Sequence, residues 1–470
     1  MSIPRSVRLA GAVLATATVA ASTSLPSATA SAEGRPPASD APKNVIVLIG
    51  DGMGYNSVDQ AALYAKGVTM HQVAGAPGKV APAKGTGAAF PFQKFPVRVG
   101  MSTYSVKGGY DPKVAWGDMA AAVKDPATDS AAASTAMATG VKTYDAGIGV
   151  DKDKKPLKNA WQAAKERGKA TGVVSSVPFS HATPAGYVAH NESRNNYHAL
   201  AEEMIDSDTN VIIGAGHPYY NDDHKRVKPN FTYLSERDFG RLEAGDAGRS
   251  FLHSKKQFDK LARNGVVSGM PKKKGKDAGK MLGLVEVGST LQQGRSGEAK
   301  NVAPFSVPMN DVPELATLTE GALNVLDKDR DGFYLMVEGG AIDWAGHANS
   351  NTRNVEETLD FTKAVDATIR WVEKNSSWKE TLVIVTADHE TGYLTGPGAN
   401  PNWTAMSGKR GELPAVTWQS GNHSNQLVPV YARGKGADML YRMATKTDPV
   451  RGRYLDNTDL AKHHFAMLKK

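Results

Sequence analysis

Short, unbroken apolar runs recur along the chain and alternate with longer stretches of helical periodicity. A run in which every position is apolar is typical of a strand buried on both faces, as in a parallel sheet. The intervening helical stretches can return the chain to the other end of such a sheet. The pattern therefore predicts an α/β fold with a mostly parallel central sheet covered by helices on both faces. Strands are expected at 44–49, 172–177, 333–337, 382–386 and 427–431, and helices at 57–66, 156–167, 313–326 and 354–375.

One long segment, residues 217–312, lacks this alternation and is rich in Lys, Gly and Asp. We interpret it as an inserted surface region that leaves the core and partly covers the functional site, rather than as a second domain. Residues 44–470 are thus predicted to form one large domain, a size that can bury an extensive core.

The first 32 residues have the pattern of a secretory signal peptide. Arg5 and Arg8 precede an apolar run, and small residues follow, with cleavage sites after Ala30 or Ala32. Residues 33–43 are then a polar, Pro-rich linker. No later segment is apolar enough to span a membrane. The sequence predicts a secreted protein, extracellular or periplasmic.

Composition narrows the chemistry. The chain has no cysteine, which excludes disulfides and thiolate chemistry and leaves His, Asp, Glu and hydroxyl oxygens as metal ligands. The net charge of +8 falls to +6 without Arg5 and Arg8, a mild excess that favours anionic substrates. We find no zinc-finger spacing and predict no nucleic-acid-binding module.

Polar residues that can bind metals or move protons lie at the ends of the apolar runs. Ligands of open parallel sheets bind beyond the carboxyl ends of the strands, so these side chains are expected to meet at one edge. They are Asp51, His181, Thr183, Glu338, Asp388 and His389, with His423 just before the last run. Each alone carries little information, but their shared position predicts a site.

Asp343 and His347 are four residues apart. On a helix this spacing places both on one face, where they suit a single metal ion. Taken alone, such a pair is more often a surface ion pair.

Ser130 stands at the start of a stretch, 130–139, that favours helix and ends at Gly140. Free N–H groups and the positive dipole end of a helix attract anions there. A serine becomes a strong nucleophile only when a base takes its proton or a metal stabilises its alkoxide. The alternative is that Ser130 merely caps the helix.

An EF-hand pattern competes for Glu338. The residues Asp-Lys-Asp-Arg-Asp-Gly at 327–332, followed by Glu338, match a calcium loop in full. Yet Gly339 and Gly340 follow Glu338 where the second helix should begin, and residues 333–337 read as a buried strand. We therefore disfavour a non-catalytic calcium-binding protein.

Taken together, these motifs strongly resemble the alkaline phosphatases. The resemblance covers residues 44 to about 435, and the motifs occur in the family's order. The matching pieces are Gly-Asp-Gly-Met-Gly at 50–54, Thr-Asp-Ser-Ala-Ala at 128–132, Ala-Thr-Pro at 182–184 through Ser-Arg at 193–194, Val-Glu-Gly at 337–339 with Asp343 and His347, Thr-Ala-Asp-His at 386–389, and His423.

The resemblance implies hydrolysis of small phosphate monoesters through a phosphoserine on two zinc ions and one magnesium ion. Ser130 would be the nucleophile and Arg194 would bind the phosphate. The resemblance also leaves a homodimer open, although the sequence shows no interface. The implied ligands are Asp343, His347 and His423 for one zinc, Asp51, Asp388 and His389 for the other, and Asp51, Thr183 and Glu338 for magnesium.

Two positions depart from many bacterial relatives, which carry Asp at the position of His181 and Lys at that of Trp344. A histidine beside the third metal suits zinc or cobalt better than magnesium, so the identity of that metal stays open. His181 is either a ligand or a hydrogen-bond partner of one, and Trp344 removes a cation near the phosphate. A phosphodiesterase or sulfatase on the same fold is the alternative function, although the absence of cysteine disfavours the Cys-derived sulfatase nucleophile.

Overall fold

A computed structural model of the chain describes residues 41–469. The predicted signal peptide, residues 1–32, and most of the predicted linker lie outside the described residues. Within residues 41–469, none of the helices combines the length and the apolar character needed to cross a membrane.

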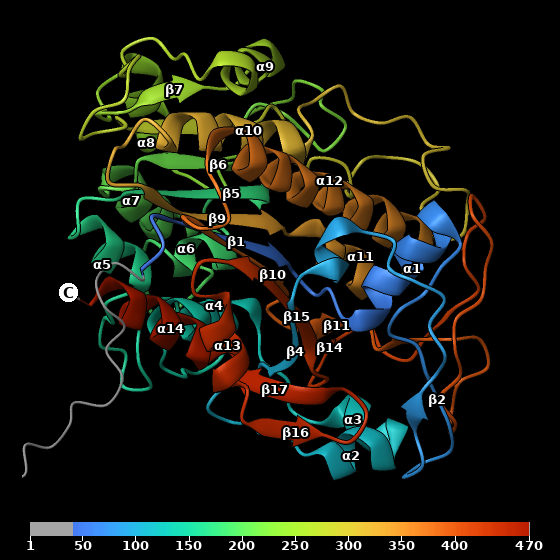
Figure 1. Cartoon of the computed structure of the whole chain (residues 1–470). Coiled ribbons are helices and arrows are strands. Elements are labelled where there is room, and N and C mark those ends of the chain that lie inside the picture. Colours follow the sequence, from blue (N-terminus) through green and yellow to red (C-terminus); the bar gives the residue numbers. More distant parts are fainter. Residues whose placement is uncertain (1–40, 470) are drawn as a thin grey trace, which may run out of the picture. The chain divides into compact units, whose positions relative to one another are not determined.

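A sheet of eleven strands runs through the described residues in the order β16-β17-β4-β15-β10-β1-β9-β5-β6-β8-β7 (Figure 1). Its strands are β1 Asn44–Gly50, β4 Val97–Ser102, β5 Ala170–Pro178, β6 Val211–Ala215, β7 Ser250–Leu252, β8 Met281–Leu284, β9 Phe333–Gly339, β10 Thr381–Thr386, β15 Val428–Gly434, β16 Lys446–Asp448 and β17 Gly452–Asp456. Three ribbons of two-residue strands lie outside it: β2 Val73–Ala74 with β3 Ala81–Pro82, β11 Glu390–Thr391 with β14 His423–Ser424, and β12 Leu394–Thr395 with β13 Thr417–Trp418.

The four central strands, β10, β1, β9 and β5, are parallel neighbours, so their carboxyl ends share one edge. In the register of β1, Val47 lies between Ile384 of β10 and Met336 of β9. Every residue of these four strands is buried. Burial on both faces explains why the runs are apolar throughout instead of alternating.

The strand expected at 427–431 forms as β15 but runs antiparallel to β10, with Tyr431 opposite Val385. The sequence prediction did not anticipate this direction, because an unbroken apolar run carries no information on the direction of its neighbours. Reversal has a functional consequence: β15 begins where the parallel strands end. His423, five residues before β15, therefore lies at the same edge as their carboxyl ends.

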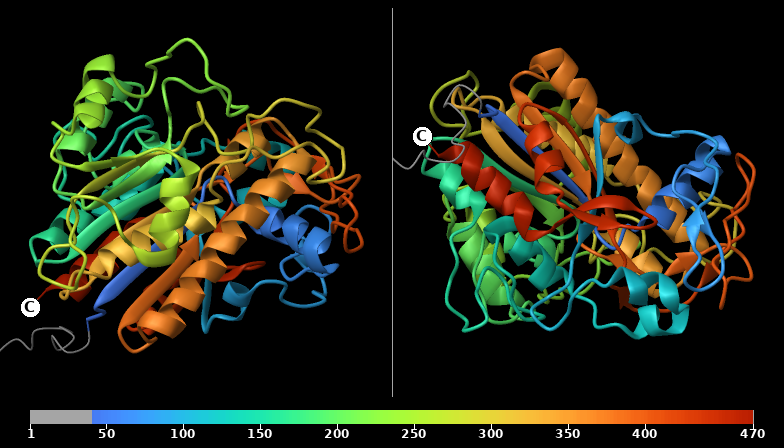
Figure 2. Two further views of the ribbon diagram at one scale, coloured as in Figure 1. Left: turned by 90° about the horizontal axis from the view of Figure 1, so that it is seen from above. Right: turned by 60° about the horizontal axis from the view of Figure 1, so that its bottom comes forward.

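Helices cover both faces of the sheet (Figures 1 and 2). Mutually packed helices α4, α5, α6, α13 and α14 lie on one side, whereas α9, α10, α12 and α1 form a second packed group. The longer helices are α1 Tyr55–Lys66, α4 Ser130–Thr139, α7 Tyr197–Asp206, α8 Glu236–Ala244, α9 Lys255–Asn264, α10 Leu315–Leu326, α12 Asn351–Asn375 and α14 Thr458–Leu468. The shorter ones are α2 Pro112–Gly117, α3 Met119–Lys124, α5 Ala160–Lys165, α6 Ala182–Gly186, α11 Ala341–His347, α13 Ala437–Met443 and the 3₁₀ turn η2 Pro91–Lys94.

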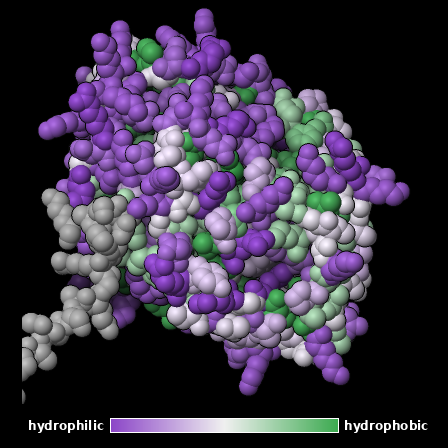
Figure 3. Space-filling view, viewed as in Figure 1, coloured by the Kyte–Doolittle hydropathy of each residue, from purple (hydrophilic) through white to green (hydrophobic). Residues whose placement is uncertain are grey.

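The segment 217–312, predicted to be an insertion, is partly built into the core. Its strands β8 and β7 continue the sheet beyond β6, in parallel. Hydrophilic side chains gather on its outer surface, over α8, α9 and β7 (Figure 3). The weak apolar periodicity thus reflects how short these strands are, three residues in β7 and four in β8.

Candidate active site

Asp51, Asp388 and His389 come together at the ends of β1 and β10. Their ligand atoms all lie within 4.8 Å of one another. His389 Nε2 is 3.4 Å from Asp51 Oδ1 and 3.3 Å from Asp388 Oδ2, and all three side chains are buried. Both of those carboxylate oxygens lack a hydrogen-bond donor. Because buried carboxylate oxygens without donors are costly, the arrangement fits a cation bound among them.

The turn that follows β1 packs closely against Asp343 and Thr391. Gly52 has φ +70°, and a Cβ there would come within 2.6 Å of Thr391 Oγ1 and 2.8 Å of Asp343 Cα. Only glycine fits such an approach. Its backbone N–H also donates to Asp388 Oδ1 at 3.1 Å, which orients that carboxylate.

A second group consists of Asp343, His347 and His423, again with ligand atoms within 4.8 Å. Asp343 and His347 share one face of α11, as their spacing predicted, with Oδ2 and Nε2 3.3 Å apart. His423 Nε2 lies 3.3 Å from Asp343 Oδ1 and 3.1 Å from His347 Nε2.

The hydrogen bonds of the two Nδ1 atoms, in His347 and His423, show why this second group fits a metal. Nδ1 of His347 is 2.7 Å from the Gly421 carbonyl, and Nδ1 of His423 is 2.7 Å from the Thr128 carbonyl. A carbonyl only accepts, so each Nδ1 carries a proton and, in the neutral ring, each Nε2 carries a lone pair. Two Nε2 atoms 3.1 Å apart need a proton or a metal cation between them. Without a metal, the hydrogen bond to Asp343 outweighs burial and raises the pKa of His423 to about 9, so a metal would replace that proton.

Oxygen atoms dominate a third position beside the first group. Thr183 Oγ1 lies 3.5 Å from Asp51 Oδ2, and Ser175 Oγ donates to Glu338 Oε2 at 2.5 Å. Glu338 Oε1 is buried without a partner. Carboxylate and hydroxyl oxygens are the ligands that magnesium prefers.

The carboxylates crowd one another electrostatically. Burial, followed by the charge of Asp388, raises the pKa of Asp51 well above its usual range. Burial also raises the pKa of Glu338 to about 7 and that of Asp388 to about 6. Burial would raise the pKa of Asp343 as well, but hydrogen bonds from His347 and His423 hold it well below its usual range. Bound cations would relieve the repulsion among these groups.

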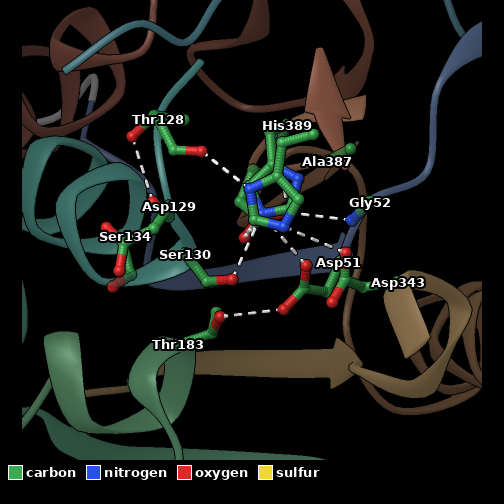
Figure 4. Close-up of polar contacts among 12 residues, drawn as sticks. Asp51, Gly52, Thr128, Asp129, Ser130, Ser134, Thr183, Asp343, Ala387 and His389 are labelled. Atoms are coloured by element: carbon green, nitrogen blue, oxygen red, sulfur yellow. Dashed lines mark hydrogen bonds and ion pairs between the residues drawn. The ribbon is translucent and has the colours of Figure 1, made fainter. Parts of the chain in front are cut away.

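Ser130 is the first residue of α4 but not its cap. Asp129 is the N-cap and accepts from the Ala132 N–H at 2.9 Å. The hydroxyl of Ser130 is therefore free to point across the site, where its Oγ lies 3.1 Å from His389 Nε2 (Figure 4). The alternative that Ser130 only caps the helix is wrong.

Arg194 faces the same end of α4. Its Nη1 donates to Asp129 Oδ2 at 3.0 Å, and its Nη2 lies 3.3 Å from His181 Nε2. The Trp344 ring packs edge-on 5.8 Å from the His181 ring. Both residues that depart from the family pattern thus lie beside the site, with His181 turned toward Arg194.

Three contributors were missed by sequence reasoning: Asp129, Ser175 and Thr391. Thr391 Oγ1 is 2.5 Å from Asp343 Oδ1 and 3.3 Å from His389 Nδ1, so it links the two candidate metal groups. Asp129 had a recognisable signal, because an acidic residue just before a helix start is a common cap. Ser175 and Thr391 had none beyond their nearness to predicted residues.

The EF-hand interpretation of residues 327–338 is excluded by local structure. A helix, α11, does begin at Ala341, so the expectation that Gly339 and Gly340 leave no room for a second helix is wrong. Residues Phe333–Gly339, however, form the extended strand β9 and not the second half of a calcium loop. Glu338 is thereby carried to the carboxyl edge of the sheet, whereas Asp327 pairs with Lys274 at the other end.

Comparison with known proteins agrees with this geometry. A family model described as alkaline phosphatase matches residues 42–413. The chain belongs to the alkaline phosphatase family. Alkaline phosphatase 3 of Bacillus subtilis (strain 168) is 36% identical over 368 residues, which cover 77% of this chain and 64% of that protein. The alkaline phosphatase of Escherichia coli (strain K12) is 28% identical and is matched over 87% of this chain and 85% of its own length.

Solved structures show the same fold. The cold-active alkaline phosphatase from the psychrophile Shewanella sp. superposes with a TM-score of 0.63 at 25% identity, covering 91% of this chain and 100% of that one. The chain spans 52% and 64% of the length of the two Bacillus subtilis relatives, alkaline phosphatases 4 and 3.

Proposed function

We propose that this protein hydrolyses phosphate monoesters through a phosphoserine formed on Ser130. The observation that carries the proposal is the approach of Ser130 Oγ to within 3.1 Å of His389 Nε2, inside a group of metal-ligand side chains. A buried serine at a helix N-terminus, facing such a group, suits attack on an anionic ester.

Three metal ions complete the proposed site. One zinc would be held by Asp343, His347 and His423, a second by Asp51, Asp388 and His389, and a magnesium by Asp51, Thr183 and Glu338. When bound, the metals supply positive charge that favours the Ser130 alkoxide and stabilises the attacking and leaving oxygens of an in-line displacement.

The residues of the chain then perform two displacements. Ser130 Oγ gives up its proton to solvent and bonds to phosphorus. The bond from phosphorus to the ester oxygen breaks, and that oxygen takes up a proton from solvent and leaves as the alcohol. Water next attacks the phosphoserine, and the Ser130 oxygen leaves, which regenerates the hydroxyl and releases inorganic phosphate. Arg194 would bind two phosphate oxygens with its planar fork, while Asp129 and His181 orient the guanidinium.

Parallel assays of an aryl phosphate monoester, a phosphate diester and an aryl sulfate test this proposal. We expect the monoester to be hydrolysed far faster than the other two, since a doubly ionised group matches the cations of the site. Preference for the diester or the sulfate would overturn it in favour of the alternative function.

Substitution at Glu338 tests the magnesium site. Glu338→Ala should lower turnover by about tenfold or more, because the third metal loses a buried ligand. Asp327→Ala is the matched control and should leave turnover nearly unchanged, since Asp327 only pairs with Lys274 at the opposite end of β9. The measurement is the turnover number of each variant, with thermal melting to verify that each variant is folded. Equal losses in both variants would contradict the assignment.

Trp344→Lys tests the place of that ring beside the phosphate. A lysine there should tighten competitive inhibition by inorganic phosphate by about fivefold, the effect of roughly 1 kcal/mol from a partly buried charge. Trp344→Leu removes the ring without adding charge and should not tighten inhibition. The same inhibition constant in both variants would show that this position lies away from bound phosphate.

A further inference from the structure

A cavity of about 350 Å³ lies away from the active site, between α9, α10, α12 and the segment 291–313 that crosses α12. Figure 1 shows α10 and α12 running side by side, and the two helices pack together. The volume is within the range of small-molecule sites, about 300–1,000 Å³. The proposed phosphatase activity makes no use of this cavity.

Glu357 lines the cavity with an unsatisfied carboxylate. Glu357 is 4% exposed, and its Oε1 atom is buried without any hydrogen-bond partner. The neighbouring Glu356, in contrast, is fully engaged: it pairs with Arg295 at 2.8 Å and Arg353 at 2.9 Å, and accepts from the Phe305 N–H at 2.7 Å. Arg295 and Arg353 therefore both pair with Glu356, and Glu357 faces the cavity without an arginine partner.

A second carboxylate extends the negative surface. Asp360 lies three residues beyond Glu357, on the same face of α12, and also lines the cavity. The two lysines at the rim are already paired, Lys363 with Glu314 at 2.6 Å and Lys255 with Asp311 at 3.0 Å. Burial, then the charges of Asp360 and Glu356, raises the pKa of Glu357 to about 8. The cavity thus disfavours a bare carboxylate and suits a cation.

A metal ion is not the occupant that this geometry favours. Among residues 41–469, only the two active-site groups bring three or more His, Asp or Glu ligand atoms within 4.8 Å. The carboxylates of the cavity do not converge in that way. Its volume also far exceeds that of one ion, which has an ionic radius of about 1 Å and binds oxygens at about 2.0–2.6 Å.

Apolar side chains supply the other half of the lining. Leu291 and Val312 are buried against the cavity, and Phe305 and Met309 line it while remaining 43% and 42% exposed. Phe305 has φ +65°, a conformation that is strained for a bulky residue. Such strain is often kept where a side chain serves a ligand site.

We propose that this cavity binds a small organic ammonium ion, with its apolar body against Phe305 and Met309 and its charged head paired with Glu357 and Asp360. The mixed lining favours an amine that has a compact hydrocarbon body over an inorganic cation. This site is independent of the proposed phosphatase chemistry.

Calorimetric titration of the metal-loaded protein with cyclohexylammonium chloride tests the proposal. Saturating inorganic phosphate keeps the active site occupied throughout. We expect saturable binding that Glu357→Gln weakens by at least about tenfold, the effect of losing a charge-assisted hydrogen bond. The amide keeps the volume of the side chain, so the variant is expected to fold. Glu373→Gln is the matched control, because it removes the same charge from an exposed position of α12.

Four results would overturn the proposal. Equal binding to wild type and Glu357→Gln would place the amine elsewhere. Equal binding of neutral cyclohexanol would indicate a merely apolar cavity. Binding of calcium without binding of the amine would indicate a metal site. No binding of any of these probes would mean that Glu357 simply carries a proton.

Discussion

Substitution of Ser130 by alanine is expected to remove the covalent phosphate from the protein and to lower turnover by about three orders of magnitude or more. In the proposed mechanism the Ser130 oxygen is the only protein atom that bonds to phosphorus. Acid quench during turnover of a labelled monoester, followed by peptide mapping, should locate the phosphate on Ser130 in the wild type. The same procedure should find none in the variant.

Stereochemistry gives a second and independent readout of the same step. Two in-line displacements each invert phosphorus, so a chiral phosphate ester should react with net retention. An added alcohol such as Tris should also capture part of the phosphoryl group, since it can replace water in the second displacement. Net inversion would rule out the phosphoserine.

Ser134→Ala is the matched control on the same helix. Ser134 Oγ donates to the carbonyls of Ala131 and Ala182, at 3.1 and 3.2 Å, and so has a structural role. Its loss should leave phosphate trapping on Ser130 intact. Phosphate mapped to Ser134 or Thr135 would show that the nucleophile has been misassigned.

Removal of metals with EDTA is expected to abolish hydrolysis, with a loss of about three orders of magnitude or more, and zinc plus magnesium should restore it. The physical reason is that, without metal ions, the crowded carboxylates of the site repel the anionic phosphate. Elemental analysis of the stripped and restored protein must accompany the assay. Full activity in metal-free protein would contradict the proposed zinc and magnesium sites.

Metal uptake should also strengthen with pH in a predictable direction. Without metal, the raised pKa values of Glu338, about 7, and Asp388, about 6, keep protons on these carboxylates in mildly acidic solution. A metal must displace those protons and also the proton of His423, because the hydrogen bond to Asp343 outweighs burial and raises the pKa of His423 to about 9. Affinity should therefore rise from about pH 5 to about pH 9 and level off above. Titration calorimetry in buffers of different ionisation enthalpy would detect the released protons. Affinity that does not change over this range would contradict the predicted protonation.

Local features of the site were predictable from the sequence, because each depends on a short stretch of chain. The apolar runs identified the central strands, since only a strand buried on both faces needs an apolar residue at every position. The spacing of Asp343 and His347 placed both on one face of a helix, as α11 has them. The helix start at Ser130 was likewise visible locally.

The tertiary structure alone decided which strands are neighbours and how they run. Apolar strands are nearly interchangeable as partners, so nothing in the run at 427–431 specified that β15 lies antiparallel to β10. That reversal carries His423 to the edge where Asp343 and His389 lie. The tertiary structure also decided the contacts of Thr391 with Asp343 and His389, because hydrogen bonds between distant segments depend on the packing of the whole sheet. The sequence determined the chemical groups, and the fold decided their distances.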